Sequence, residues 1–179
     1  MDKIRKMSIF LKYVFWLLLI SIPVFEVAGW LFFDGYDSWL VPEVMFDFED
    51  EVFPVVMTQT TRILGVVVTL PQVLLDMFCM WQMVKLFSLY EAGNIFTAEN
   101  SACYRRAAWA FLICEVINPF VQAGTSYVIS MNNEVGERFV TVGIDDANIG
   151  TIIVACVILA ISWVMDEGRK LQDEAELTI

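Results

Sequence analysis

The segment 9-IFLKYVFWLLLISIPVFEVAGWLFF-33 decides the fold. It is long enough to cross the hydrocarbon core of a bilayer, which takes about 20 residues of apolar helix. Lys3, Arg5 and Lys6 precede it, as they would in a secretory signal peptide. The apolar run is too long for a signal peptide, however, and no small-residue cleavage site follows it. We therefore predict a retained membrane-spanning helix.

Three further apolar segments of spanning length follow this one. The chain is 58% hydrophobic, whereas soluble domains are roughly 45–50% apolar. We predict an all-α membrane protein, in which all 179 residues form one membrane domain built as a four-transmembrane-helix bundle. The four spans are expected at about residues 9–33, 62–83, 107–129 and 149–165.

The basic residues predict the orientation of these spans. Of the 11 Lys and Arg residues, all except Arg62 and Arg138 fall in segments on one side. Loops rich in Lys and Arg stay in the cytoplasm, so both termini are expected there. The acidic segments at residues 34–61 and 130–148 would then form an extracytoplasmic cap. Within the second of them, residues 138–142 alternate weakly, as in a short strand or hairpin.

Composition excludes several classes of function. The net charge of −11 argues against direct nucleic-acid binding. The chain has no His, which removes the usual catalytic base and the commonest zinc and haem ligand. It also has no phosphate-binding loop and no nucleophile with a base, so we expect no enzyme, no cofactor and no metal site. The four cysteines form no metal or disulfide pattern and are interpreted as small packing residues.

Three ionisable residues lie inside the predicted spans: Glu26, Asp76 and Glu115. Each costs on the order of 3 kcal/mol on insertion scales. Asp76 lies nine residues before Lys85, and Glu115 lies nine residues after Arg106. At about 1.5 Å per residue, both carboxyls should lie about 13–14 Å from the inner boundary, at the same depth on neighbouring antiparallel helices.

Other polar residues continue these two helix faces at spacings of three and four residues. We call the whole set the polar ladder: Glu26, Thr69, Gln72, Asp76, Glu115, Asn118 and Gln122. Two interpretations stay open. Two facing carboxyls cannot easily both ionise, which favours a site for a proton, a cation or a cationic ligand. Alternatively, the ladder is a neutral hydrogen-bonded seam that fixes helix register.

Two further features concern the helices themselves. Small residues on one face of the last span predict close helix packing: Thr151, Ala155, Ile158 and Ser162. Three spans contain a proline, which frees a backbone carbonyl and can bend a helix: Pro23, Pro71 and Pro119.

Two stretches resemble a known family. The link between the second and third spans reads YEAGNIFTAEN (residues 90–100), in which Gly93 suits a helix end and Thr97 a helix start. The chain ends in MDEGRKLQDEAELTI (165–179). Together they resemble the DUF2975 family of bacterial four-helix membrane proteins, with its G-x-I/P-F-T-x-x-N link and E-G-x-x-L-x-x-E-x-x-L-T-I ending.

The resemblance implies a multi-pass protein of the bacterial inner membrane. Members of the family are often encoded beside small helix-turn-helix regulators, which implies a sensor or regulator. It supplies no catalytic residues. Both matched stretches fall on the expected cytoplasmic side, where they form either a cap on the bundle or a docking face for a soluble partner. The residues of this motif face are Gly93, Phe96, Thr97, Asn100, Gly168, Glu174, Leu177, Thr178 and Ile179.

Three functions remain open on the sequence. The first is a regulatory or sensory protein that binds a ligand in the polar ladder and a cytoplasmic regulator protein at the motif face. The second is a small proton- or cation-coupled transporter or channel that uses Asp76 and Glu115. The third is an immunity or envelope-protection protein. The expected partners are the lipid bilayer, a second copy of the chain in a homo-oligomer, and the regulator protein.

Overall fold

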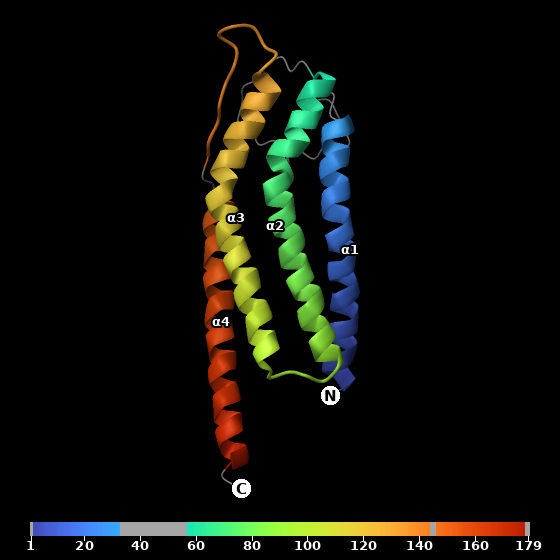
Figure 1. The fold of residues 1–179 in the computed structure, drawn as a ribbon, viewed down its shortest axis with the longest axis vertical. Coiled ribbons are helices and arrows are strands. Elements are labelled where there is room, and N and C mark those ends of the chain that lie inside the picture. The colour runs from blue at the N-terminus through green and yellow to red at the C-terminus, as the bar shows by residue number, and fades with distance from the viewer. Residues whose placement is uncertain (1, 33–56, 144–145, 178–179) are drawn as a thin grey trace. The chain divides into compact units, whose positions relative to one another are not determined.

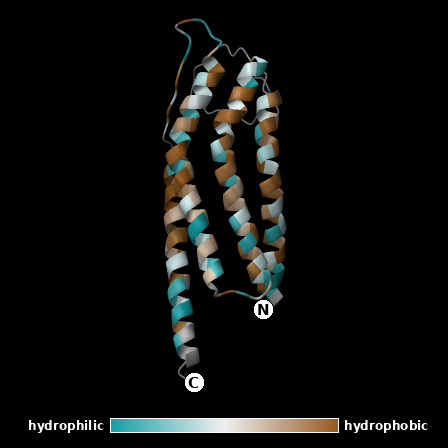
Figure 2. Ribbon diagram, viewed as in Figure 1, coloured by the Kyte–Doolittle hydropathy of each residue, from teal (hydrophilic) through white to brown (hydrophobic). Residues whose placement is uncertain are grey.

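The computed structural model describes residues 2–32, 57–143 and 146–177. Their regular secondary structure consists of four α-helices: α1 (Asp2–Phe32), α2 (Gln59–Glu91), α3 (Ala98–Ser130) and α4 (Asp146–Leu177) (Figure 1). All four are long and apolar enough to cross a membrane, as the sequence predicted. Hydrophobic residues gather along the middle of α4, and hydrophilic residues gather toward its C-terminal end (Figure 2).

Each helix extends past its predicted span because polar capping residues lie beyond the apolar segments. Thr58 begins α2: its Oγ1 accepts a hydrogen bond from the backbone N of Thr61 at 3.2 Å, the geometry of an N-cap. Gly93 ends α2 with a φ of 86°. Its N–H donates to the Tyr90 carbonyl, and Asn94 N–H donates to the Leu89 carbonyl. That pair of bonds is a Schellman motif, which confirms the expected helix end.

The chain divides into two compact units. The first unit comprises Met1–Ser21, Leu75–Val116 and Asp145–Ile179, and the second comprises Ile22–Leu74 and Ile117–Ile144. In each of the three helices that the division crosses, it falls within three residues of a proline: Pro23 in α1, Pro71 in α2 and Pro119 in α3. A proline removes one intrahelical hydrogen bond, so each helix is least restrained where it passes from one unit to the other.

In the first unit, α3 buries small residues against α2. These residues are spaced four, three and four apart on one helix face: Cys103, Ala107, Ala110 and Cys114. The Cys79 thiol of α2 donates to the Ala107 carbonyl at 3.7 Å. Because the side chains on this face are small, the two helix backbones can approach closely.

The adjoining face of α3 packs against α4 in the same unit (Figure 1). Ala155 and Ser162, two members of the predicted small-residue stripe, are completely buried, and Ala108 is buried opposite on α3. On its other side, α2 packs against α1 through aromatic pairs. Phe15 stacks on Phe87 with ring centroids 5.5 Å apart, and Trp16 meets Trp81 edge-on at 5.9 Å.

In the second unit, α1 and α2 meet where a large residue lies against a glycine. The Trp30 side chain is 1% exposed. A Cβ placed on Gly65 would lie 2.2 Å from the Trp30 ring. Arg62 donates to the Trp30 carbonyl at 3.1 Å and also to the Leu31 carbonyl. A cation at the C-terminal turn of a helix is favourable, so Arg62 fixes the end of α1.

The segment after α3 is extended, but it is not a β-strand as the weak alternation suggested. Serine hydroxyls of α3 replace the partner strand. Ser130 Oγ accepts from the N–H of Phe139 at 3.2 Å and donates to its carbonyl at 3.0 Å. Ser126 Oγ bonds Thr141 in the same way, at 2.9 and 3.4 Å. Four residues of helix rise about 6 Å and two extended residues about 6.6 Å, so the two spacings match.

The predicted cap is described only in part. The first acidic segment lies mostly within residues 33–56, outside the described residues. The second acidic segment is described up to residue 143.

Candidate functional site

Two carboxyls of the first unit make hydrogen bonds at adjacent positions of α3. The Asp76 carboxylate, on α2, accepts a hydrogen bond from the Cys114 thiol of α3 at 3.7 Å. Glu115, the next residue of α3, accepts a hydrogen bond from the side-chain amide of Asn148 on α4 at 2.7 Å. We call these four residues the carboxylate cluster: Asp76, Cys114, Glu115 and Asn148.

The position of each member follows from helix geometry. Consecutive residues of an α-helix are rotated by about 100°. Cys114 belongs to the face of α3 that packs on α2, so Glu115 turns toward the next neighbour, α4. Asn148 lies in the first turn of α4, three residues before Thr151, and continues its small-residue stripe. That stripe faces α3, and for this reason the Asn148 amide reaches Glu115.

The partners of these carboxyls in the described hydrogen bonds are neutral. A thiol and an amide supply hydrogen bonds but no opposite charge, so an ionised carboxylate in the apolar region gains no ion pair from them. Among the described residues no group of three or more His, Cys, Asp or Glu side chains could hold a metal ion. The described donors to the two carboxyls are thus one thiol and one side-chain amide.

The other members of the polar ladder make contacts within the second unit. Glu26 accepts from the Trp30 indole at 3.0 Å, and Thr69 donates to the Gly65 carbonyl at 3.2 Å. Gln122 accepts from the Gly143 N–H at 2.8 Å and so continues the anchoring of the extended segment by Ser126 and Ser130. Each of these bonds holds local structure.

The two remaining ladder residues are Gln72 and Asn118, both partly buried. Gln72 Oε1 is buried and has no hydrogen-bond partner among the described residues. Within the part of the chain that the structure describes, no hydrogen bond joins Asp76 directly to Glu115. The sequence predicted that Asp76 and Glu115 lie at the same depth. In the structure Asp76 contacts Cys114, the residue of α3 that precedes Glu115.

The sequence interpretation missed three residues: Cys114 and Gln82, which are buried, and Asn148, which is partly buried. Asn148 was assigned to the end of a loop, and Cys114 was treated only as a packing residue. Gln82 on α2 is 4% exposed, and its Oε1 has no hydrogen-bond partner among the described residues. Extending the small-residue stripe by three positions would have found Asn148. No pattern in the sequence marks Gln82, since a lone Gln near the end of an apolar segment is equally compatible with exposure.

Three residues of the motif face hold the α2–α3 link together. The Asn100 side chain is fully buried, and its amide donates to the carbonyls of Asn94 and Ile95 at 2.7 and 2.6 Å. Thr97 Oγ1 accepts from Asn100 N–H at 3.4 Å, as expected of the residue that begins α3. With Gly93 at the end of α2, these residues make a fixed turn.

The rest of the motif face is on the surface where it is described. Phe96 is 58% exposed, and Gly168 and Glu174 are exposed as well. The Leu177 side chain and residues Thr178 and Ile179 lie outside the described residues. Leu171 is 60% exposed.

The charged part of α4 is tied to α3. Arg105 contacts the Asp166 carboxylate at 3.1 Å. Lys170, four residues after Asp166 on the same helix, pairs with Glu167 at 3.1 Å. Asp166 pairs with Arg105 because Arg105, like Glu115, lies on the side of α3 that contacts α4. Polar contacts thus join α4 to α3 at both ends of their common interface.

These features define a multi-span membrane protein with four apolar helices, partly buried carboxyls on two of them and a fixed α2–α3 turn. A family described as "Protein of unknown function (DUF2975)" matches residues 47–179. The chain therefore belongs to the DUF2975 family. The matched region contains α2, α3 and α4 with both motif stretches, and it leaves α1 outside. No curated protein and no solved structure matches the chain.

Proposed function

We propose that this protein is a membrane sensor or regulator in which α4 connects the carboxylate cluster to the C-terminal end of the chain. The observation that carries the proposal is the 2.7 Å hydrogen bond between Glu115 and Asn148. It attaches the first turn of α4 to a carboxyl that a proton or a cationic ligand can neutralise. A change of charge at Glu115 would change this attachment.

The second attachment of α4 to α3, between Asp166 and Arg105, supports a role for α4 in transmitting a movement along its length. Beyond it α4 continues to Leu177 as a charged helix. The exposed apolar side chains of Phe96 and Leu171 near this end suit a soluble regulator protein. On this proposal the bundle serves no catalytic role and needs no cofactor, and it binds no nucleic acid directly.

The charge distribution supports the proposed setting. With basic residues concentrated around both termini and the α2–α3 link, these parts face the cytoplasm of a bacterial cell and the acidic segments face outward. The protein would then lie in the inner membrane, alone or as a homo-oligomer, with its motif face available to a cytoplasmic partner.

The coupling step can be tested on the purified full chain in nanodiscs. Spin labels at Phe96 and Leu171 would report the separation between the link and α4 while the pH is stepped from about 8 to about 5. We expect the distance distribution to shift in the wild type and to stay fixed in Glu115→Gln. Glu99→Gln, an exposed carboxyl on the same helix, is the matched control and should behave as wild type.

A cellular measurement tests the regulatory role. We expect removal of residues 175–179 to alter the transcript profile as deletion of the whole chain does, while the shortened protein remains in the membrane. Identical transcript profiles in the wild type, the shortened chain and the deletion strain would contradict a regulatory function.

The second candidate function is proton- or cation-coupled transport. It is favoured by two carboxyls: Asp76 contacts Cys114 of α3, and Glu115 is the next residue of α3. Transport predicts ion flux into liposomes that Asp76→Asn or Glu115→Gln abolishes. The sensor predicts no flux from the wild type, so the same liposomes separate the two functions.

A further inference from the structure

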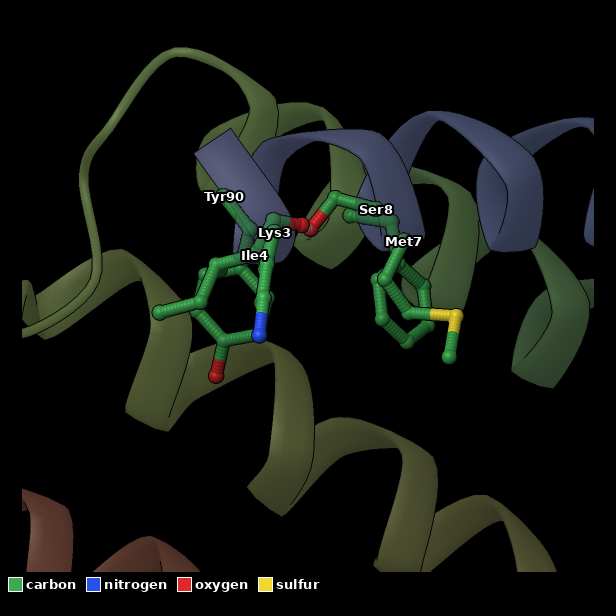
Figure 3. A pocket seen from close by; sticks show the side chains of 6 residues that line it. Lys3, Ile4, Met7, Ser8 and Tyr90 are labelled. Atoms are coloured by element: carbon green, nitrogen blue, oxygen red, sulfur yellow. Dashed lines mark hydrogen bonds between the residues drawn. The ribbon is translucent and has the colours of Figure 1, made fainter. Parts of the chain in front are cut away.

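A groove opens between the first turns of α1 and the last turns of α2, within the first unit. It has a volume of about 320 Å³ and is lined by Lys3, Ile4, Met7, Ser8, Phe87 and Tyr90. The side chains of Lys3, Met7 and Tyr90 gather on one side of α1 (Figure 3). This groove is separate from the carboxylate cluster, and none of its lining residues belongs to the motif face.

The walls of the groove are apolar and its mouth is cationic. Ile4, Met7 and Phe87 supply aliphatic and aromatic surface, and Met7 is 59% exposed. Lys3 and Met7 are four residues apart, so the ammonium and the thioether lie on one face of α1. Arg5 and Lys6 are exposed beside them.

The groove's local charge is positive. Lys3, Arg5 and Lys6 oppose one acid, Asp2, so residues 2–6 sum to +2 (3 − 1). Glu91 follows Tyr90 at the end of α2, but Lys12 of α1 neutralises it in an ion pair. The Tyr90 hydroxyl contacts the Tyr104 hydroxyl at 2.9 Å, which holds that wall of the groove in place. Of the described side chains that line the groove, Lys3 is the one cation, and none is acidic.

The position of the groove indicates which kind of molecule would fit it. It lies where two spanning helices end, and Tyr side chains are typical of the membrane–water interface. An apolar surface continues along α1 from Met7 to Phe10 and Leu17, which are 62% and 67% exposed. An anionic head with an apolar chain would match this order of cations and apolar surface.

We propose that this groove is a binding site for an anionic phospholipid of the leaflet that faces the termini. The phosphate would contact the Lys3 ammonium, and an acyl chain would lie over Met7 and Phe10. Lys3 and its neighbours confer the preference for an anionic head, and Phe87 with Ile4 confers the fit of the chain.

Native mass spectrometry of the full chain, released from nanodiscs that hold equal amounts of phosphatidylglycerol and phosphatidylcholine, tests this site. We expect retained phosphatidylglycerol on the wild type and about fivefold weaker retention on Lys3→Gln, since one basic residue near the surface contributes about 1 kcal/mol. Lys85→Gln removes an exposed lysine of α2 that does not line the groove, and should retain the lipid as the wild type does.

A second variant separates the groove from a general surface charge. Met7→Trp fills the groove and leaves every cation in place, and we expect it to lose the lipid to a similar degree. Circular dichroism would confirm that it remains helical.

Three results would overturn the proposal. One is equal retention of the two lipids by the wild type, and another is an equal loss in Lys85→Gln and Lys3→Gln. The third is displacement of the lipid by millimolar inorganic phosphate, which would show that a free anion occupies the site.

Discussion

Asn100 illustrates how one side chain can fix a membrane hairpin. Its side chain is fully buried, and its amide donates to two backbone carbonyls of the α2–α3 link, those of Asn94 and Ile95. The link's own N–H groups do not reach these carbonyls, so the side chain satisfies them.

We predict that Asn100→Ala lowers the free energy of unfolding by about 2 kcal/mol, because two buried acceptors lose their donors. Asn94→Ala is the matched control, since the Asn94 side chain is exposed and the described bonds of Asn94 use only its backbone N–H and carbonyl. Unfolding of the detergent-solubilised chain, followed by circular dichroism, measures both. An Asn100→Ala protein as stable as the control would show that the carbonyls find water instead.

Single residues also mark how far the sequence could be interpreted. Counting from Lys85 and Arg106 placed Asp76 and Glu115 at one depth, and both do contact neighbours around consecutive positions of α3. Depth needs only the rise per residue, which is constant. Direction needs the rotation of α3, and one residue changes that by about 100°. The pairing of Glu115 with Asn148 therefore could not be derived from spacing alone.

At the scale of helix pairs, α1 and α2 depend on one close approach. Gly65 leaves room for the Trp30 ring, and an added Cβ would lie 2.2 Å from it. We predict that Gly65→Ala costs about 1–3 kcal/mol, the usual range for overpacking, when unfolding is followed as above. Gly168→Ala, where an added Cβ meets nothing within 4 Å, is the control and should be neutral or stabilising.

A double variant checks that the Trp30 ring is the cause. If Gly65→Ala acts through this contact, it should cost less in a Trp30→Ala background, where the ring is gone. Equal costs in the two backgrounds would assign the effect to the α2 backbone instead.

The extended segment after α3 gives an element-scale prediction of its own. Ser126 and Ser130 each bond both backbone groups of one residue, Thr141 and Phe139. We predict that Ser130→Ala speeds hydrogen exchange of the Phe139 amide about tenfold, because a bond of about 1–1.5 kcal/mol is lost. Thr141 exchange should change less, since Ser126 remains.

The reverse pattern should follow Ser126→Ala, and exchange resolved by residue would show it. Uniform acceleration of both amides in either variant would mean that the segment detaches as a unit. The sequence indicated an extended segment here through its alternation. It could not indicate that hydroxyls on a helix would replace a second strand, since serines in a span are equally compatible with bonds to their own helix.

At the scale of the whole molecule, the division between the two compact units falls within three residues of a proline in each of α1, α2 and α3. Asp76 and Glu115 belong to the first unit, each one residue from its boundary in the sequence. Pro119 removes the usual intrahelical donor to the Glu115 carbonyl. Glu115 of the carboxylate cluster therefore lies where the α3 backbone lacks one intrahelical hydrogen bond.

The orientation of the molecule decides whether the proposed sites face the right compartment. We predict that both termini are cytoplasmic, because the basic residues gather there. Val135, in the loop after α3, is 94% exposed, and Leu171 on α4 is 60% exposed. In a Cys156→Ala background, which removes the exposed native thiol, Val135→Cys should react with a membrane-impermeant maleimide on spheroplasts. Leu171→Cys should react only after the membrane is broken.

The opposite labelling pattern would have consequences beyond topology. It would place Phe96 and Leu171 outside the cell, where no cytoplasmic regulator can bind them, and would move the groove at Lys3 to the outer leaflet. Labelling at both positions in intact spheroplasts would indicate two orientations in one population. Because basic residues near span ends set the orientation, replacing Lys3, Arg5 and Lys6 with Gln should then shift the population further toward the inverted form. If the proposed orientation is correct, most molecules of the same triple variant should keep it, since Lys85, Arg105, Arg106 and the basic residues of α4 remain.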